Sequence, residues 1–146
     1  MGEGTILVTG ATRGIGAAIA KELAAGGARV AGLTRSGETA AGEGFVCDVT
    51  DEAAIARAVA AVAERGPIMG LVNNAGLYEE HRSEGLSAAD FERLMRTNAT
   101  SVLVASREVY PHLKRAGGGL IVNIGSFFDK MGVARGVAYC ASKAAI

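Results

Sequence analysis

Tyr139 and Lys143 are the residues of this 146-residue sequence whose types and spacing point most directly to chemistry. Because they lie four residues apart in a segment with a helical pattern, both side chains are expected on one helix face. Tyrosine is a poor acid-base group at neutral pH, since its ordinary pKa is ~10, but a nearby ammonium group favours the phenolate. The pair could therefore donate a proton to a carbonyl oxygen or accept one from an alcohol. Such pairs also occur on surface helices that have no catalytic role.

A second segment with chemical potential is the glycine-rich run from Gly10 to Gly16, which also contains Gly14. It lies between an apolar segment at residues 5–9 and a helical pattern at residues 17–25. Glycines at such a turn let the backbone approach a pyrophosphate, which rests on the N-terminus of the following helix. The spacing differs from the common G-x-G-x-x-G pattern. The run alone therefore fits either a nucleotide-binding turn or an ordinary strand-to-helix connection.

Both segments belong to a chain in which short apolar runs alternate with helical patterns. The apolar runs predict strands at residues 5–9, 28–34, 44–48, 70–73 and 120–125. The helical patterns cover residues 17–25, 52–65, 88–97 and 100–115, and begin again at residue 138. Only about ten residues separate the second and third strands, which is short for a parallel crossover, so a bare loop or an abbreviated helix is expected there. The alternation predicts an α/β fold of Rossmann-like type, a doubly wound parallel sheet with helices on both faces.

The composition limits the classes of protein to which the sequence can belong. Hydrophobic residues make up 49% and charged residues 21%, which is typical of a globular protein. Lys+Arg 15 and Asp+Glu 15 cancel, so no basic surface for nucleic acid or an anionic membrane is expected. The sequence shows neither a signal-peptide pattern nor an apolar run long enough to span a membrane, which favours a cytoplasmic location. Two cysteines and two histidines predict neither a disulfide framework nor a metal site, and all four are interpreted as structural or surface residues: Cys47, Cys140, His81 and His112.

Taken together, the motifs form a more specific pattern. Thr9-Gly10-x-x-x-Gly14-Ile15-Gly16 is followed by Asn73-Asn74-Ala75-Gly76, Asn98, Ser126 and Tyr139-x-x-x-Lys143. In this order the sequence resembles the short-chain dehydrogenase/reductase family over essentially its whole length, with 3-oxoacyl-carrier-protein reductases and small sugar or polyol dehydrogenases most alike in these motifs. The resemblance implies an oxidoreductase that interconverts a carbonyl and a secondary alcohol with a nicotinamide coenzyme. It also implies that five of the family's usual seven strands are present.

The resemblance implies a role for each catalytic residue. Tyr139 is the acid-base group, and Lys143 promotes its ionisation and binds the nicotinamide ribose. Ser126 orients the carbonyl oxygen, and Asn98 holds a water that relays protons to the lysine. The coenzyme contacts implied, besides the tyrosine and the lysine, are Gly10, Thr12, Gly14, Ile15, Gly16, Asp48, Val49, Asn74, Ala75 and Gly76. Each polar residue could instead close a turn or cap a helix.

The end of the second predicted strand bears on the choice of coenzyme. An acidic residue at that place usually binds the ribose 2′-hydroxyl of NAD, but here the residue is Thr34, followed by Arg35. Arg13 lies within the glycine-rich run. Two guanidinium groups and a hydroxyl suit a 2′-phosphate, so NADP(H) is predicted to be preferred, with NAD(H) possible. The alternative is that both arginines are solvated surface charges.

The substrate and the assembly stay open at the level of sequence. The substrate could be a 3-oxoacyl carrier-protein thioester or a sugar or polyol, because the loops at residues 77–85 and 127–137 are expected to line the entrance. A second hypothesis for function is a coenzyme-binding module without catalysis. The resemblance implies a homo-oligomer for the full-length form, with residues 100–115 in one of the interface helices.

The end of the chain supports one more expectation. Residues 143–146 stop inside a helical pattern with no Gly, Asn or Pro stop signal, whereas the family continues well beyond this helix. We therefore expect residues 1–146 to be a single dinucleotide-binding domain that lacks its C-terminal part. Such a fragment would have little activity by itself and would leave an open apolar strand edge at residues 120–125.

Overall fold

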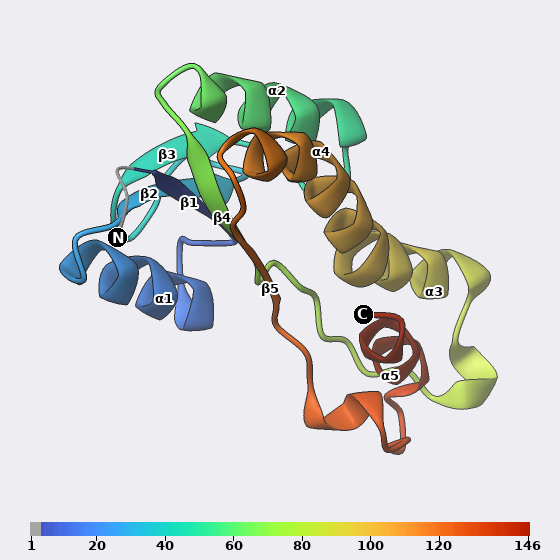
Figure 1. The fold of residues 1–146 in the computed structure, drawn as a ribbon. Coiled ribbons are helices and arrows are strands. Elements are labelled where there is room, and N and C mark those ends of the chain that lie inside the picture. The colour runs from blue at the N-terminus through green and yellow to red at the C-terminus, as the bar shows by residue number, and fades with distance from the viewer. Residues whose placement is uncertain (1–3) are drawn as a thin grey trace.

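The computed structural model describes residues 4–146, which fold around a five-stranded sheet (Figure 1). All strand pairs are parallel, and the spatial order is β3-β2-β1-β4-β5. The strands are β1 (Thr5–Thr9), β2 (Arg29–Thr34), β3 (Glu43–Val46), β4 (Ile68–Asn73) and β5 (Leu120–Asn123). The chain runs outward from β1 to β3 and then crosses to β4 on the other side of β1. This order confirms the predicted Rossmann-like, doubly wound parallel sheet, in which ligands bind at the carboxyl ends of the strands where the order reverses.

Helices cover the sheet on both faces (Figure 1). Helix α1 (Gly14–Ala25) lies on one face, and α2 (Glu52–Ala63) and α4 (Ser101–Arg115) lie on the other. Helices α3 (Ala88–Met95) and α5 (Val137–Ala144) pack against each other beyond the carboxyl ends of the strands. Three shorter helical segments are η1 (Ser83–Gly85), the π-helical η2 (Arg96–Thr100) and η3 (Phe127–Asp129).

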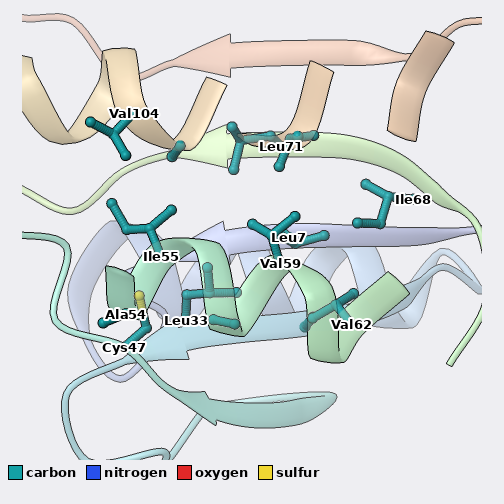
Figure 2. Close-up of a cluster of buried hydrophobic side chains, with 14 of the residues drawn as sticks. Leu7, Leu33, Cys47, Ala54, Ile55, Val59, Val62, Ile68, Leu71 and Val104 are labelled. Atoms are coloured by element: carbon teal, nitrogen blue, oxygen red, sulfur yellow. The ribbon is translucent and has the colours of Figure 1, made fainter. Parts of the chain in front are cut away.

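The larger hydrophobic core lies between the sheet and helices α2 and α4 (Figure 2). Leu7, Leu33 and Leu71 come from the three central strands, and Ile55 and Val59 come from α2; each is at most 2% exposed. The central strands β1, β2 and β4 consist mostly of buried residues, as expected for strands that are covered on both faces. This core fixes the central strands and therefore the loops at their carboxyl ends.

The core on the other face is smaller and is centred on β1, β2 and β4. Val8, Val30 and Val72 pack there with α1. On β5, by contrast, the side chains of Leu120 and Val122 are 59% and 41% exposed. Among the described residues no strand pairs with the outer side of β5, so the predicted open apolar edge is present.

The junction between α3 and α4 differs from the prediction. The sequence pattern predicts two separate helices, but α3 and α4 form one continuous helical run through η2 (Figure 1). The hydroxyls of Thr97 and Ser101 donate to the carbonyls of Arg93 and Thr97, at 2.9 and 2.6 Å. Because these hydroxyls bond back to the preceding helical turn, the polar stretch bends into a π-helical segment rather than ending the helix.

The remaining predicted elements are all present, with ends that shift by a few residues. The largest shift is at α1, which begins at Gly14 because the glycines themselves enter the helix. The connection between β2 and β3 is a bare loop, which was one of the two expected forms. The N-cap of α2 is Asp51, whose side chain accepts from the backbone N–H of Ala53. Within residues 4–146, every helix is too short or too polar to span a bilayer.

Candidate active site

The glycine-rich turn joins β1 to α1 at the carboxyl edge of the sheet. Gly10 and Gly14 have φ angles of +69° and +58°, in the left-handed region that favours glycine. Gly16 is buried in the first turn of α1, where a Cβ atom would overlap the Gly10 carbonyl oxygen and the side-chain amide of Asn74. The three glycines therefore bring the helix close to the strands, as their spacing predicts.

The N-terminus of α1 suits an anionic group. Arg13 occupies the capping position without a side-chain hydrogen bond to the helix, and no acidic residue lies in the first turn. The first backbone N–H groups therefore lack a side-chain acceptor, and such helix ends bind phosphate. A Cβ at Gly14 would meet no atom within 4 Å, so a ligand has room to approach the backbone. These residues fit the pyrophosphate of a dinucleotide coenzyme.

The segment after β4 is hydrogen-bonded to the same turn. Thr9 Oγ1 accepts from the backbone N–H groups of Asn74 and Ala75, at 3.0 and 2.9 Å. In return, Asn74 Nδ2 donates to the carbonyls of Thr9 and Gly10, at 3.0 and 3.3 Å. These four bonds hold the ends of two neighbouring strands together, so both can face one ligand.

Asn98 connects the end of β4 to helix α5. It is fully buried in η2, and π-helical segments of this kind are frequent at functional sites. Its Oδ1 accepts from the N–H of Leu77 at 2.7 Å, and its Nδ2 donates to the Leu77 carbonyl and to Ser142 Oγ, both at 2.9 Å. Ser142 in turn donates to the carbonyl of Tyr139 at 2.8 Å. Asn98 therefore acts as a link between elements rather than as a helix cap, and its implied water relay stays a prediction.

Tyr139 and Lys143 lie one turn apart on α5, as predicted. Lys143 Nζ donates to the Ile124 carbonyl, just after β5, at 2.7 Å and lies 5.9 Å from the centroid of the Tyr139 ring. The lysine is 7% exposed, and this burial lowers its pKa below the ordinary lysine value. Gly76 is its neighbour, since a Cβ there would lie 3.9 Å from Nζ. The pair thus meets the ends of both β4 and β5.

Ser126 lies between β5 and η3. Its Oγ accepts from the N–H of Phe128 at 3.2 Å, so it caps the short helical turn that follows. The Phe128 ring packs against the Tyr139 ring, with centroids 6.5 Å apart, which brings the segment that contains Ser126 to α5. Its role in orienting a carbonyl oxygen stays a prediction.

The residues expected near the adenosine part of a coenzyme lie around the loop after β2. Arg13 and Arg35 are exposed, whereas Thr34 is buried. The hydroxyls of Thr34 and Thr12 both donate to the carbonyl of Glu38, at 2.8 and 3.2 Å. The two threonines therefore hold this loop against the glycine-rich turn, and the two arginines are the cationic side chains that remain open to solvent.

Asp48 and Val49 follow β3. Asp48 Oδ1 accepts from the backbone N–H and the hydroxyl of Thr50, at 2.9 and 2.8 Å. These bonds, the backbone bond first, hold the pKa of the Asp48 carboxyl below its usual value, and the positive charge of Arg35 adds to the lowering. Val49 is half-buried against the larger core. Asp48 therefore presents a charged, exposed carboxylate at the edge where an adenine contact is implied.

Among the described residues, the cysteines and histidines form no arrangement comparable to the Tyr139–Lys143 pair. Cys47 is buried, and burial raises the pKa of its thiol to about 11, which makes it unreactive near neutral pH. A group of three side chains, Glu79, His81 and Asp90, brings two carboxylate oxygens and one imidazole nitrogen within 4.8 Å of one another. The Arg93 guanidinium binds both carboxylates, at 2.6 and 2.9 Å, so this group forms an ion-paired cluster on the surface.

Three contributions to the site were not anticipated from the sequence. They are the hydroxyl of Ser142, the backbone of Leu77 and the carbonyl of Ile124. Ser142 offers a weak signal, because it is a polar residue within the Tyr-to-Lys segment of a helix. The two backbone contributions have no side-chain signature, so only the folded chain shows them.

Fold and site together define a class of protein: a Rossmann-like α/β domain with a glycine-rich turn at the point where the strand order reverses, and a tyrosine-lysine pair on a helix at the same edge of the sheet. The sequence model described as short chain dehydrogenase matches residues 4–146. The chain therefore belongs to the short-chain dehydrogenase family, as its motifs indicated. Members of this family are oxidoreductases that bind nicotinamide coenzymes.

Individual relatives agree with this assignment. The D-threitol dehydrogenase of Mycolicibacterium smegmatis is 40% identical over 150 residues, covering 94% of this chain and 58% of that protein. The 3-oxoacyl-[acyl-carrier-protein] reductase MabA of Mycobacterium bovis is 38% identical over 144 residues, covering 97% and 58%. The ligand-free structure of Thermoplasma acidophilum aldohexose dehydrogenase has a TM-score of 0.91 at 32% identity, covering 98% of this chain and 57% of that chain. The chain thus spans about 58% of the length of the curated relatives it matches.

Proposed function

We propose that the protein containing this chain is a nicotinamide-dependent oxidoreductase that interconverts a carbonyl group and a secondary alcohol, with Tyr139 as the acid-base group. The observation that carries the proposal is the pair on α5. The Lys143 ammonium, fixed by the Ile124 carbonyl, lies 5.9 Å from the Tyr139 ring. Relatives named as dehydrogenases and reductases support it. The coenzyme supplies the hydride when bound.

The residues of this chain would move and hold the proton. Tyr139 donates it to the substrate oxygen in reduction and accepts it in oxidation. Lys143 would hold its ammonium group beside the Tyr139 ring, 5.9 Å from the centroid. Ser126 would orient the substrate oxygen. Asn98 keeps the geometry, because its hydrogen bonds tie α5 to the end of β4.

The acid-base role is tested by Tyr139→Phe in the full-length protein. Removing the proton should lower turnover by at least ~10²-fold, the low end for general acid-base catalysis, while coenzyme binding is retained. Tyr110→Phe is the matched control, since Tyr110 is 59% exposed on α4, and it should leave turnover unchanged. Parent turnover in Tyr139→Phe would support a coenzyme-binding module without catalysis instead.

The same residues carry the proposed coenzyme preference. Gly10, Gly14 and Gly16 would hold the pyrophosphate at the N-terminus of α1, and the exposed Arg13 and Arg35 support NADP(H) over NAD(H). A charge-assisted hydrogen bond of about 1.5–3 kcal/mol corresponds to roughly 10-fold or more in affinity. Arg35→Ala should therefore raise KM for NADP(H) about 10-fold and leave that for NAD(H) unchanged. A higher kcat/KM with NAD(H) in the parent would contradict the preference.

For the substrate, we propose two classes that the relatives support equally: a 3-oxoacyl carrier-protein thioester, and a sugar or polyol. On the second of the two loops expected at the entrance, residues 127–137, the apolar side chains of Phe127 and Met131 are exposed, at 75% and 50%. A comparison of kcat/KM for a 3-oxoacyl thioester and for a set of sugars and polyols decides between the classes.

Homo-oligomerisation of the full-length protein is also proposed. The exposed Leu103 on α4 supports it, and light scattering tests it.

A further inference from the structure

Two loops meet at the Tyr139 ring, residues 77–85 after β4 and residues 127–136 after β5. Tyr78, from the first loop, packs on the Tyr139 ring with centroids 4.9 Å apart and planes at 85°. Phe128, from the second loop, packs on it at 6.5 Å and 81°. Edge-to-face contacts of this kind are the preferred arrangement of aromatic pairs. Each loop therefore supplies one ring that limits how Tyr139 can tilt.

Tyr78 makes the closer of these two contacts and is itself anchored. Its hydroxyl donates to Glu80 Oε1 at 3.0 Å. The hydrogen bond to this carboxylate is the main cause that raises the pKa of Tyr78 above its ordinary value, so Tyr78 stays protonated and continues to donate. The ring itself is half-exposed, so the surrounding side chains enclose it only in part.

Glu80 also reaches the other loop. Its Oε2 lies 3.6 Å from Arg135 Nε, and the N–H of the next residue, His81, donates to the Arg135 carbonyl at 2.9 Å. Arg135 has a φ angle of +64° and is the one non-glycine residue with positive φ in residues 4–146. Such outliers persist only where surrounding contacts hold them, and they cluster at functional sites. The backbone and side chain of Arg135 are both used to hold the first loop.

We propose that Tyr78 is a positioning residue for Tyr139, held in place by a clasp formed by Glu80, His81 and Arg135 across the two loops. The proposal rests on the proposed oxidoreductase function. An acid-base group must lie within hydrogen-bond reach of the atom it protonates, and displacements of about 1 Å can cost 10²-fold in rate. The contacts of Tyr78 are consistent with a positioning role, because its hydroxyl donates to Glu80 and its ring packs on the Tyr139 ring.

The test compares Tyr78→Ala with Tyr78→Phe in the full-length protein, with saturating coenzyme. Tyr78→Ala removes the ring and should lower kcat about 10-fold, well within the range for misplaced groups, with an unchanged Kd for the coenzyme. Tyr78→Phe keeps the ring and should restore kcat to within about 3-fold of the parent. Rescue by phenylalanine, together with a change in kcat and not in coenzyme affinity, separates positioning from general loss of structure. Parent kcat in Tyr78→Ala, or equal loss in both variants, would overturn the proposal.

A second pair of variants tests the clasp. Arg135→Gly relieves the left-handed backbone but removes the ion pair to Glu80, and it should lower kcat about 2- to 5-fold. Arg82→Ala is the matched control, because Arg82 forms an ion pair of the same length, 3.6 Å to Glu84, but within its own loop, so its loss leaves the contact between the two loops in place. Equal kcat in these two variants would overturn the role given to Arg135.

Tyr139→Phe, assayed alongside, separates the positioning role of Tyr78 from the proposed oxidoreductase function. If Tyr139→Phe loses turnover and Tyr78→Ala does not, only the positioning proposal is wrong. If Tyr139→Phe keeps the parent turnover, the proposed function is wrong, and the role of Tyr78 falls with it.

Discussion

The two halves of the candidate site are built in different ways. The glycine-rich turn at residues 9–16 follows the central strand β1 and is fixed by close backbone approach: Gly10 and Gly14 adopt left-handed φ angles, and Gly16 packs against the Gly10 carbonyl and the Asn74 amide. Helix α5, which carries the proposed catalytic pair, has eight residues and follows β5, whose side chains are mostly exposed in residues 4–146. Its position depends on polar bonds from Asn98 and Lys143.

This difference predicts how each half can be damaged. An isolated helix as short as α5 is marginal in water, so the place of Tyr139 depends on a few hydrogen bonds whose loss leaves buried polar groups unpaired. The turn depends instead on the absence of side chains. The half of the candidate site on α5 should therefore be destabilised by the loss of a polar group, and the turn should be destabilised by the gain of a methyl group.

Asn98→Ala is expected to have the largest effect on stability. It removes three hydrogen bonds. The N–H and the carbonyl of Leu77 lose their partner, and Ser142 Oγ loses a donor. At about 1–3 kcal/mol for each unsatisfied buried group, the free energy of unfolding should fall by about 3 kcal/mol. Urea unfolding of the full-length protein measures this, and turnover should fall while coenzyme affinity changes less.

The matched control is Asn123→Ala on β5. Asn123 makes one bond of this kind, accepting from Asn73 Nδ2 at 2.9 Å, and without it Asn73 still donates to Ser106 Oγ at 3.2 Å. Its loss should cost less than about 1 kcal/mol, within the net value of a single hydrogen bond. Equal losses of stability in the two variants would show that Asn98 is not the link between β4 and α5.

The same difference explains how much of the structure could be predicted from the sequence. The turn was predictable because glycine spacing next to an apolar strand reports directly on backbone geometry. The topology followed from the alternation of strands and helices. Tyr139 and Lys143 were predictable as a pair because a four-residue spacing places them one helical turn apart.

What the sequence could not predict is how α5 is held. The bonds to the Leu77 backbone and the Ile124 carbonyl are made by groups that every residue possesses. The continuous run from α3 to α4 was also missed, because the hydroxyls of Thr97 and Ser101 bond back to the helix instead of ending it. Such choices depend on tertiary packing, which overrides local preference.

Gly16→Ala is the corresponding test of the turn and should have an intermediate effect. The new methyl group would overlap the Gly10 carbonyl oxygen and the Asn74 amide, and overpacking of this kind costs about 1–3 kcal/mol. Coenzyme affinity should fall as well, because the N-terminus of α1 must shift. Gly14→Ala is the control: its Cβ meets no atom, so the cost is the left-handed strain alone, about 1 kcal/mol. Greater destabilisation by Gly14→Ala would contradict the packing argument.

The smallest expected effect is a pH dependence of the same sign, but in two different pH ranges, at Lys143 and at Asp48. Burial lowers the pKa of Lys143 below the ordinary 10.5, so between the folded and unfolded pKa values the unfolded chain binds more protons, and stability rises with pH. The hydrogen bonds of Thr50 lower the pKa of Asp48 below 3.8, so its contribution is present above that value and is lost as pH falls through the folded pKa. The free energy of unfolding of the parent is compared with those of Lys143→Met and Asp48→Asn across pH. The stability of the parent relative to Lys143→Met should rise as pH rises towards 10.5. The stability of the parent relative to Asp48→Asn should fall below pH 3.8. A difference between parent and Lys143→Met that shrinks as pH rises would mean that the lysine is stabilised in its charged form by a partner, rather than penalised by burial.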